Sequence, residues 1–188
     1  EDRFESRHRR KDGSVFEVEI GIQYQPTDGG RLVAFLRDIT ARKQAEEALR
    51  IKDWAIDSAT NAIVTSDLAG NLNYVNPAFL KLWGYGSPAE VLGKPAVGFW
   101  HMGEKAAEVV EAVRANGGWI GELVAQRKDG ALFDVHVASS LVVNDAGQPV
   151  CMQASFADIT ERKRAEEALR HQNEMQRTIL DSIPVMVG

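Results

Sequence analysis

The side chains best suited to catalysis or metal binding are few and scattered along this chain of 188 residues. The chain has one cysteine, Cys151, and four histidines, at His8, His101, His136 and His171. None of them has partners at the spacing of a metal site. No glycine-rich loop has the spacing that holds nucleotide phosphates. We therefore expect no catalytic centre and no metal in these residues.

Composition and charge narrow the class of protein further. A net charge of −5 argues against a nucleic-acid partner, because phosphate binding requires a basic surface. No stretch approaches the ~18 apolar residues of a membrane span, so we expect no membrane insertion. A single cysteine suits a reducing compartment, and we expect a cytoplasmic protein. Because the chain begins at Glu1 and stops within an apolar run, we expect it to belong to a longer protein.

An internal repeat determines the predicted architecture. Residues 38–50 recur at 158–170 with only two differences, at an offset of 120. The sequence Arg-Lys-Asp-Gly at 10–13 recurs at 127–130, at an offset of 117. The second copy therefore has three more residues between the two motifs, which we expect a hairpin loop to absorb.

The repeat surrounds three predicted antiparallel strands, which must position any site. In the second copy Phe133, Val135 and Val137 alternate with polar residues, as in a half-buried strand. Its three strands are expected at 119–126, 132–141 and 150–159. The first copy compresses three strands into 4–40. We expect Phe16, Val18 and Ile20 there to lack a core, since no helices cover them.

Only the second copy has a front half in this sequence. A short hairpin is predicted between residues 62 and 75. Asn76 and Pro77 are typical of a helix start, and Ser87 and Glu90 suggest a capping box on a second short helix. A longer helix is expected at 104–115. The whole is an α+β fold, a five-stranded antiparallel sheet with its helices on one face.

This order of elements, with the motifs along it, resembles the PAS sensory family with its PAC motif. The motifs lie at 67–70, 74–79, 84–85, 90–93, 119–122, 127–130 and 158–160. The resemblance implies a tandem array. It consists of the back half of one PAS domain (1–40), a linker helix (41–56), a complete PAS domain (57–160), a second linker helix (161–180) and the start of a further PAS domain (181–188).

PAS relatives hold haem, flavin or small metabolites between sheet and helices. The resemblance implies a pocket lined by the inward positions of the sheet, Leu123, Ala125, Val135, Val137, Ala154 and Phe156. Flavin-binding relatives place amides at the positions of Ala125, Val135 and Phe156. Here all three are apolar, which would leave buried flavin groups unpaired at about 1–3 kcal/mol each.

Two other cofactor requirements of the family are also missing. The photoactive flavin branch needs a cysteine on the helical side, whereas Cys151 falls on a predicted strand. Haem relatives take an axial histidine from the long helix, and residues 104–115 contain none. We therefore expect no flavin, haem or other prosthetic group. An unidentified small metabolite is the alternative.

The resemblance also assigns signal coupling to the Asp-Ile-Thr motif, where the last strand becomes a helix. The coupling residues are Asp158 and Thr160, with Asp38 and Thr40 in the first copy, and each threonine hydroxyl is expected to cap its helix. Along the first linker a heptad seam, Ala45, Leu49, Lys52, Ile56 and Ala59, predicts a homodimer. The alternative is a helix folded back on its own sheet.

The function implied is a sensory and dimerisation module of a multidomain bacterial signalling protein. A sensor histidine kinase is our first expectation, with its output domain in the same chain. The fragment itself is not expected to be an enzyme, because His171 lacks the His-Glu-x-x-x-Pro setting of a phosphoacceptor. The alternatives are a diguanylate cyclase or phosphodiesterase, or a ligand-free structural spacer.

Overall fold

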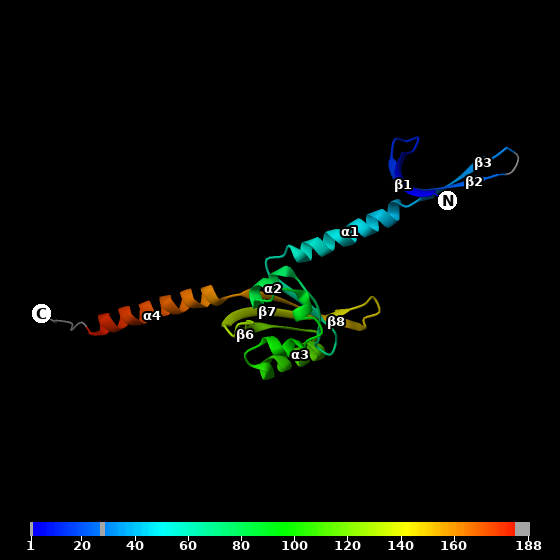
Figure 1. Cartoon of the computed structure of the whole chain (residues 1–188). Coiled ribbons are helices and arrows are strands. Elements are labelled where there is room, and N and C mark those ends of the chain that lie inside the picture. Colours follow the sequence, from blue (N-terminus) through cyan, green and yellow to red (C-terminus); the bar gives the residue numbers. More distant parts are fainter. Residues whose placement is uncertain (1, 27–28, 183–188) are drawn as a thin grey trace. The chain divides into compact units, whose positions relative to one another are not determined.

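The computed structural model describes residues 2–26 and 29–182, which divide into two compact units, residues 1–55 and 56–188 (Figure 1). The second unit contains a five-stranded antiparallel sheet in the order β5-β4-β8-β7-β6. Its strands are β4 Ala62–Ser66, β5 Leu72–Val75, β6 Gly118–Gln126, β7 Leu132–Val143 and β8 Pro149–Asp158. The predicted α+β fold is confirmed.

The helices of this unit lie between β5 and β6 in the chain and pack on one face of the sheet. They are α2 Pro77–Trp83, the short 3-10 helices η1 Pro88–Glu90 and η2 Ala96–Phe99, and α3 Gly103–Asn116. Helix α2 contacts β4, while α3 contacts β6 and β7. The core of the unit lies between this helical layer and the sheet.

Only some of the capping interactions predicted at the helix starts are present in the structure. Asn76 caps α2 as predicted, because its side chain accepts a hydrogen bond from the Phe79 amide, and Pro77 occupies the first helical position. The capping box at Ser87 is wrong, since the Ser87 hydroxyl makes no capping bond. Glu90 instead accepts a bond from the Gly86 amide at 2.9 Å and pairs with Lys128. A 3-10 turn is too short to need the cap that a longer helix requires.

The first unit is a three-stranded antiparallel meander, β1 Asp2–Arg9, β2 Val15–Gln25 and β3 Arg31–Asp38. Strands β7 and β8 have 12 and 10 residues, whereas β2 and β3 have 11 and 8. The three additional residues of the second copy therefore lengthen its strands, and the expectation that a loop absorbs them is wrong. The longer β7–β8 hairpin projects beyond the rest of its sheet (Figure 1).

Burial in the first unit differs from expectation. Val18 and Ile20 are buried, at 0% and 9% exposure, because they lie on the central strand with cross-strand neighbours on both sides. Large apolar side chains stay exposed on β3, with Leu32 at 74% and Leu36 at 58%, and also at both ends of the central strand, at Val15 and Tyr24. Among the described residues, the buried apolar residues of this unit are thus limited to the middle of β2 and to Ile39.

A long helix follows each meander, α1 Thr40–Asp57 and α4 Thr160–Ser182. The last predicted seam residue, Ala59, lies beyond the end of α1. Residues 181 and 182 continue α4, and the remainder of the predicted third domain lies outside the described residues. Within the described ranges, no helix has the length and apolar character needed to cross a membrane.

Candidate functional site

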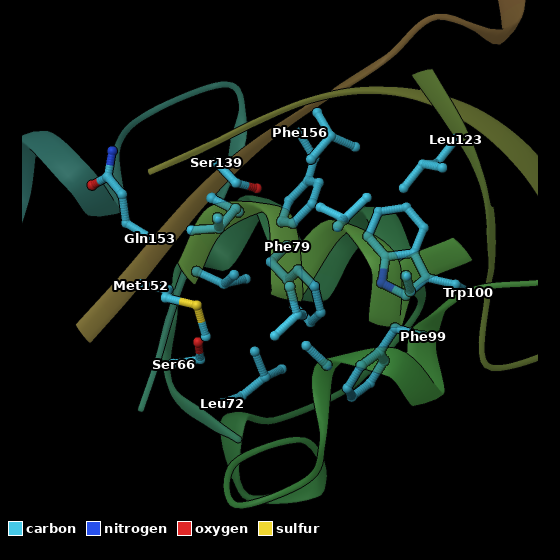
Figure 2. Close-up of a pocket in the computed structure, with 18 of the residues that line it drawn as sticks. Ser66, Leu72, Phe79, Phe99, Trp100, Leu123, Ser139, Met152, Gln153 and Phe156 are labelled. Carbon is cyan, nitrogen blue, oxygen red and sulfur yellow. The ribbon is translucent and has the colours of Figure 1, made fainter. Parts of the chain in front are cut away.

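An apolar cavity of about 70 Å³ lies between the sheet and the helices of the second unit (Figure 2). Four predicted pocket residues line it, Leu123, Val137, Ala154 and Phe156. The other two, Ala125 and Val135, are fully buried in the adjoining core and are not among its lining residues. The inward face of the sheet therefore divides into a cavity wall and a solid core.

The aromatic part of the helical wall, which adjoins aliphatic side chains of α3, was not identified from the sequence. It comprises Phe79 and Trp83 on α2, and Phe99 and Trp100 at the end of η2. The rings of Phe79 and Trp83 stack at 4.4 Å, and Trp83 meets Phe156 edge to face at 5.1 Å. Phe79 and Trp83 are four residues apart in the helix that Asn76 caps, so both rings lie on one helix face. This spacing could have been recognised in the sequence.

Polar groups contribute little to the cavity. Ser66 is buried at its edge, and the side chain of Gln153 extends away from the apolar group (Figure 2). The indole nitrogen of Trp83 already donates to the Phe99 carbonyl at 3.2 Å. Among the described residues, no buried side-chain polar atom lacks a hydrogen-bond partner. The lining is therefore mainly apolar, with Ser66, Ser139 and Gln153 as its polar residues.

Size and lining together define what fits this cavity. Sites for drug-sized ligands occupy about 300–1,000 Å³, and an apolar cavity of about 150 Å³ holds benzene. A space of about 70 Å³ is smaller than either. The residues present do not fit flavin or haem, because both would require the aromatic wall to move and would leave polar edges unpaired.

The junction between β8 and α4 is a second functional region. The Asp158 carboxylate accepts bonds from the Thr160 amide at 2.9 Å and from Arg127 at 3.2 Å. The Thr160 hydroxyl accepts a bond from the Asp134 amide on β7 at 3.1 Å. The prediction that this hydroxyl caps α4 is therefore wrong, because it binds the neighbouring strand instead.

Electrostatics favour the charged form of Asp158. Burial is the largest single influence on its pKa and raises it. The hydrogen bonds from Thr160 and the positive charge of Arg127 outweigh burial, so the pKa of Asp158 lies below its ordinary value of 3.8. The junction is therefore held by a carboxylate at neutral pH.

The first unit repeats this junction atom for atom. Asp38 accepts bonds from the Thr40 amide at 2.9 Å and from Arg10, while the Thr40 hydroxyl accepts from the Glu17 amide at 3.0 Å. Each arginine also lies over a ring, Arg10 over Phe16 at 4.2 Å and Arg127 over Phe133 at 4.1 Å. The sequence predicted the Asp and Thr of these junctions, but it did not identify the arginines.

Comparison with known proteins identifies the family. The sequence matches the PAS domain family over residues 1–41 and 60–161. This chain belongs to the PAS domain family. In the PAS domain Arg127 donates to the Leu82 carbonyl as well as to Asp158, so one side chain joins the end of α2 to the end of β8, two residues before α4 begins.

Curated and structural relatives agree with this assignment. A nitrogen fixation regulatory protein of Klebsiella oxytoca is 29% identical over 135 residues, which are 70% of this chain and 27% of that protein. The chain thus spans about a quarter of the length of the curated relatives it matches.

Two solved structures share both fold and sequence with the chain. A PAS domain from Colwellia psychrerythraea is 28% identical, with a TM-score of 0.56, over 61% of this chain and 98% of that one. An RNA-binding light-oxygen-voltage receptor is 27% identical, with a TM-score of 0.60, over 71% of this chain and 39% of that one.

Proposed function

We propose that this chain is the sensory and dimerisation module of a multidomain bacterial signalling protein and carries no catalytic centre of its own. The observation that carries the proposal is the shared sheet: Phe156 on β8 walls the apolar cavity, and the same strand ends two residues later at Asp158 in the junction with α4. A change in the cavity therefore acts on the strand from which the output helix starts.

The ligand we propose for the cavity is a small, uncharged, apolar molecule rather than flavin or haem. The apolar lining and the volume of about 70 Å³ support this, and a ligand-free spacer is the competing hypothesis. A larger occupant would have to displace Trp100 or Phe99, which are held by contacts with Phe156 and Phe79.

We further propose that the first unit is the back half of a second PAS domain in a tandem array. The family match to residues 1–41 and the repeated junction at Asp38 support this. In this interpretation α1 and α4 are signalling helices that pair with a second copy of the chain. Leu49 and Trp54 on α1, exposed at 61% and 54%, would lie in or near that pairing.

As output domain we propose a sensor histidine kinase, which is the expectation from the family resemblance; the curated relatives support a regulatory role in general. The test is phosphoryl transfer from labelled ATP by the full-length protein, in the parent and in Val137→Phe, which fills the cavity. We expect the variant to change basal phosphorylation several-fold, about 1 kcal/mol of coupling. The matched control is Val142→Phe, on the exposed face of the same strand, which should leave it unchanged. Equal rates in all three proteins, or no phosphorylation at all, would contradict the proposal.

A further inference from the structure

A second pocket, of about 120 Å³, lies beside the apolar cavity and has a different character. Its walls carry the charged side chains of Lys105, Glu122, Asp134 and Lys163. Trp100 and Leu123 line both spaces, and they lie on the same side of the apolar cavity (Figure 2). These two side chains are therefore a partition between the cavity and a group of charges.

The charges form a compact network at the first turn of α4, which we name the charge clamp: Glu122, Asp134, Arg162 and Lys163. The Lys163 ammonium lies 2.8 Å from Asp134 and 3.1 Å from Glu122, and Arg162 lies 2.7 Å from Glu122. The two carboxylates stand on adjacent strands, β6 and β7, and both basic residues stand on the helix. The clamp thus ties the helix to two strands at once.

The first unit carries the part of this arrangement that involves the strand matching β6. Glu5 on β1 pairs with Arg42 at 2.8 Å and with Lys43, both on the first turn of α1. Glu5 precedes Glu122 by 117 residues and Lys43 precedes Lys163 by 120, the offsets of the internal repeat. Glu5, Arg42 and Lys43 thus stand at the positions in the first copy that match Glu122, Arg162 and Lys163 in the second, so the strand-to-helix ion pairs occur at both helices.

Ion pairs elsewhere on α4 differ from the clamp. Arg170 pairs with Glu174 at 3.1 Å, four residues further along the same helix. Such a pair supports the helix but has no bearing on where the helix lies relative to the sheet. Arg170 is therefore a matched control for the clamp residues.

We propose that the charge clamp is a latch that holds α4 against the sheet, and that an occupant of the apolar cavity opens it by displacing the Trp100–Leu123 partition. This inference rests on the proposed sensory function. Leu123 is the chain neighbour of Glu122, so movement of the partition moves a clamp carboxylate directly. Partly exposed ion pairs are individually weak and depend steeply on geometry, so a small displacement is enough to release them.

The test uses hydrogen exchange of the backbone amides of residues 161–168 in the whole chain, with global stability measured by urea unfolding. Lys163→Met should speed exchange there about tenfold, and Arg170→Met less than about twofold. Ala106→Leu adds volume to the cavity from α3, outside the sheet. It should speed exchange about tenfold in the parent and less than about twofold in the Lys163→Met background.

Two results would overturn the proposal. Unchanged exchange in Lys163→Met would show that the clamp does not hold α4, and an equal effect of Ala106→Leu in both backgrounds would show that the cavity acts by another route. Should Ala106→Leu fail to fold, Ala154→Val fills the same cavity from β8 and takes its place. The cavity-filling variants need no ligand, so this test can fail while the proposed ligand and output stand, and the reverse also holds.

Discussion

Asn76 connects three elements of the fold through one buried side chain. Its carboxamide oxygen accepts bonds from the amides of Ile63 at 2.9 Å and Phe79 at 3.0 Å. Its nitrogen donates to the carbonyls of Ile56 at 3.1 Å and Asn61 at 3.0 Å. The residue thus joins the end of α1 and strand β4 to the start of α2, whose rings wall the cavity.

We expect Asn76→Ala to destabilise the domain by about 2–4 kcal/mol, because two backbone amides and two carbonyls lose a buried partner. Urea unfolding of parent and variant measures this cost. Asn73→Ala is the matched control, since it removes only an exposed bond to Thr65 and should cost less than about 1 kcal/mol. Equal costs for the two variants would show that the four bonds are not a structural centre.

Because the pKa of Asp158 is lowered, we expect its contribution to the stability of the fold to depend on pH. A carboxyl with a lowered folded pKa contributes stability above its ordinary value of 3.8, and loses it as pH falls through the folded value. The stability difference between the parent and Asp158→Asn should therefore be constant from pH 7 to about 5 and shrink below about pH 4. Comparing the two proteins removes the contribution of other carboxyls. A difference as large at pH 3 as at pH 7 would contradict this assignment.

Individual site residues could be predicted from the sequence where their role depends only on neighbours along the chain. The Asn76 cap and the inward positions Leu123, Val137, Ala154 and Phe156 follow from turn chemistry and strand alternation. Arg127, in contrast, binds Leu82 and Asp158, which lie 45 and 31 residues away from it along the chain. Such contacts depend on strand register, which the sequence alone did not specify.

At the scale of elements, helix α1 exposes a row of apolar side chains that its own unit does not cover. Leu49 is 61% exposed and Ile56 is 38% exposed, and α1 has no buried residue. An isolated helix of 18 residues with such a face is marginal in water, so a partner helix accounts for it best. The predicted alternative, folding back on its own sheet, would have buried Leu49.

We therefore expect Leu49→Asp to convert the chain from dimer to monomer, because the charge would lie in the helix seam. Sedimentation velocity over a tenfold concentration range measures the change. Gln44→Asp, on an exposed position outside the seam, should leave the dimer intact. If Leu49→Asp sediments as the parent does, α1 is not the dimerisation element.

The bounds of the helices and strands were predicted better than the side-chain hydrogen bonds at the helix starts. The five strands of the PAS domain and the long helix α3 lie within one or two residues of their predicted bounds. The errors at Ser87 and Thr160 share one cause. A side chain at a helix start has several amides within reach, and the fold decided which one it binds.

At the scale of the whole molecule, the two signalling helices differ in length. Helix α1 has 18 residues, and α4 has 23 in the described part of the chain. The distance from Asp38 to Asp57 is 19 residues and from Asp158 to Asp181 it is 23, a difference of four. In the proposed tandem array, four helical residues would turn the following domain by about 40° and shift it by ~6 Å. In a heptad seam this is a stutter, which locally unwinds the supercoil.

Deleting residues 170–173 should therefore change the basal output of the full-length protein, whereas deleting seven residues from the same stretch should change it less. A seven-residue deletion leaves the heptad phase of α4 as it is, whereas a four-residue deletion removes the stutter and so changes the phase. Output activity at equal expression measures the effect. Unchanged activity in both deletions would mean that α4 is a passive tether.

We propose that the PAS domain senses through a small apolar cavity without flavin or haem. The most direct measurement is an absorbance spectrum of the purified chain, followed by mass spectrometry of whatever the denatured protein releases. Our account predicts a colourless protein that releases at most a small, uncharged, apolar molecule. A flavin band or a haem Soret band in stoichiometric amount would contradict it.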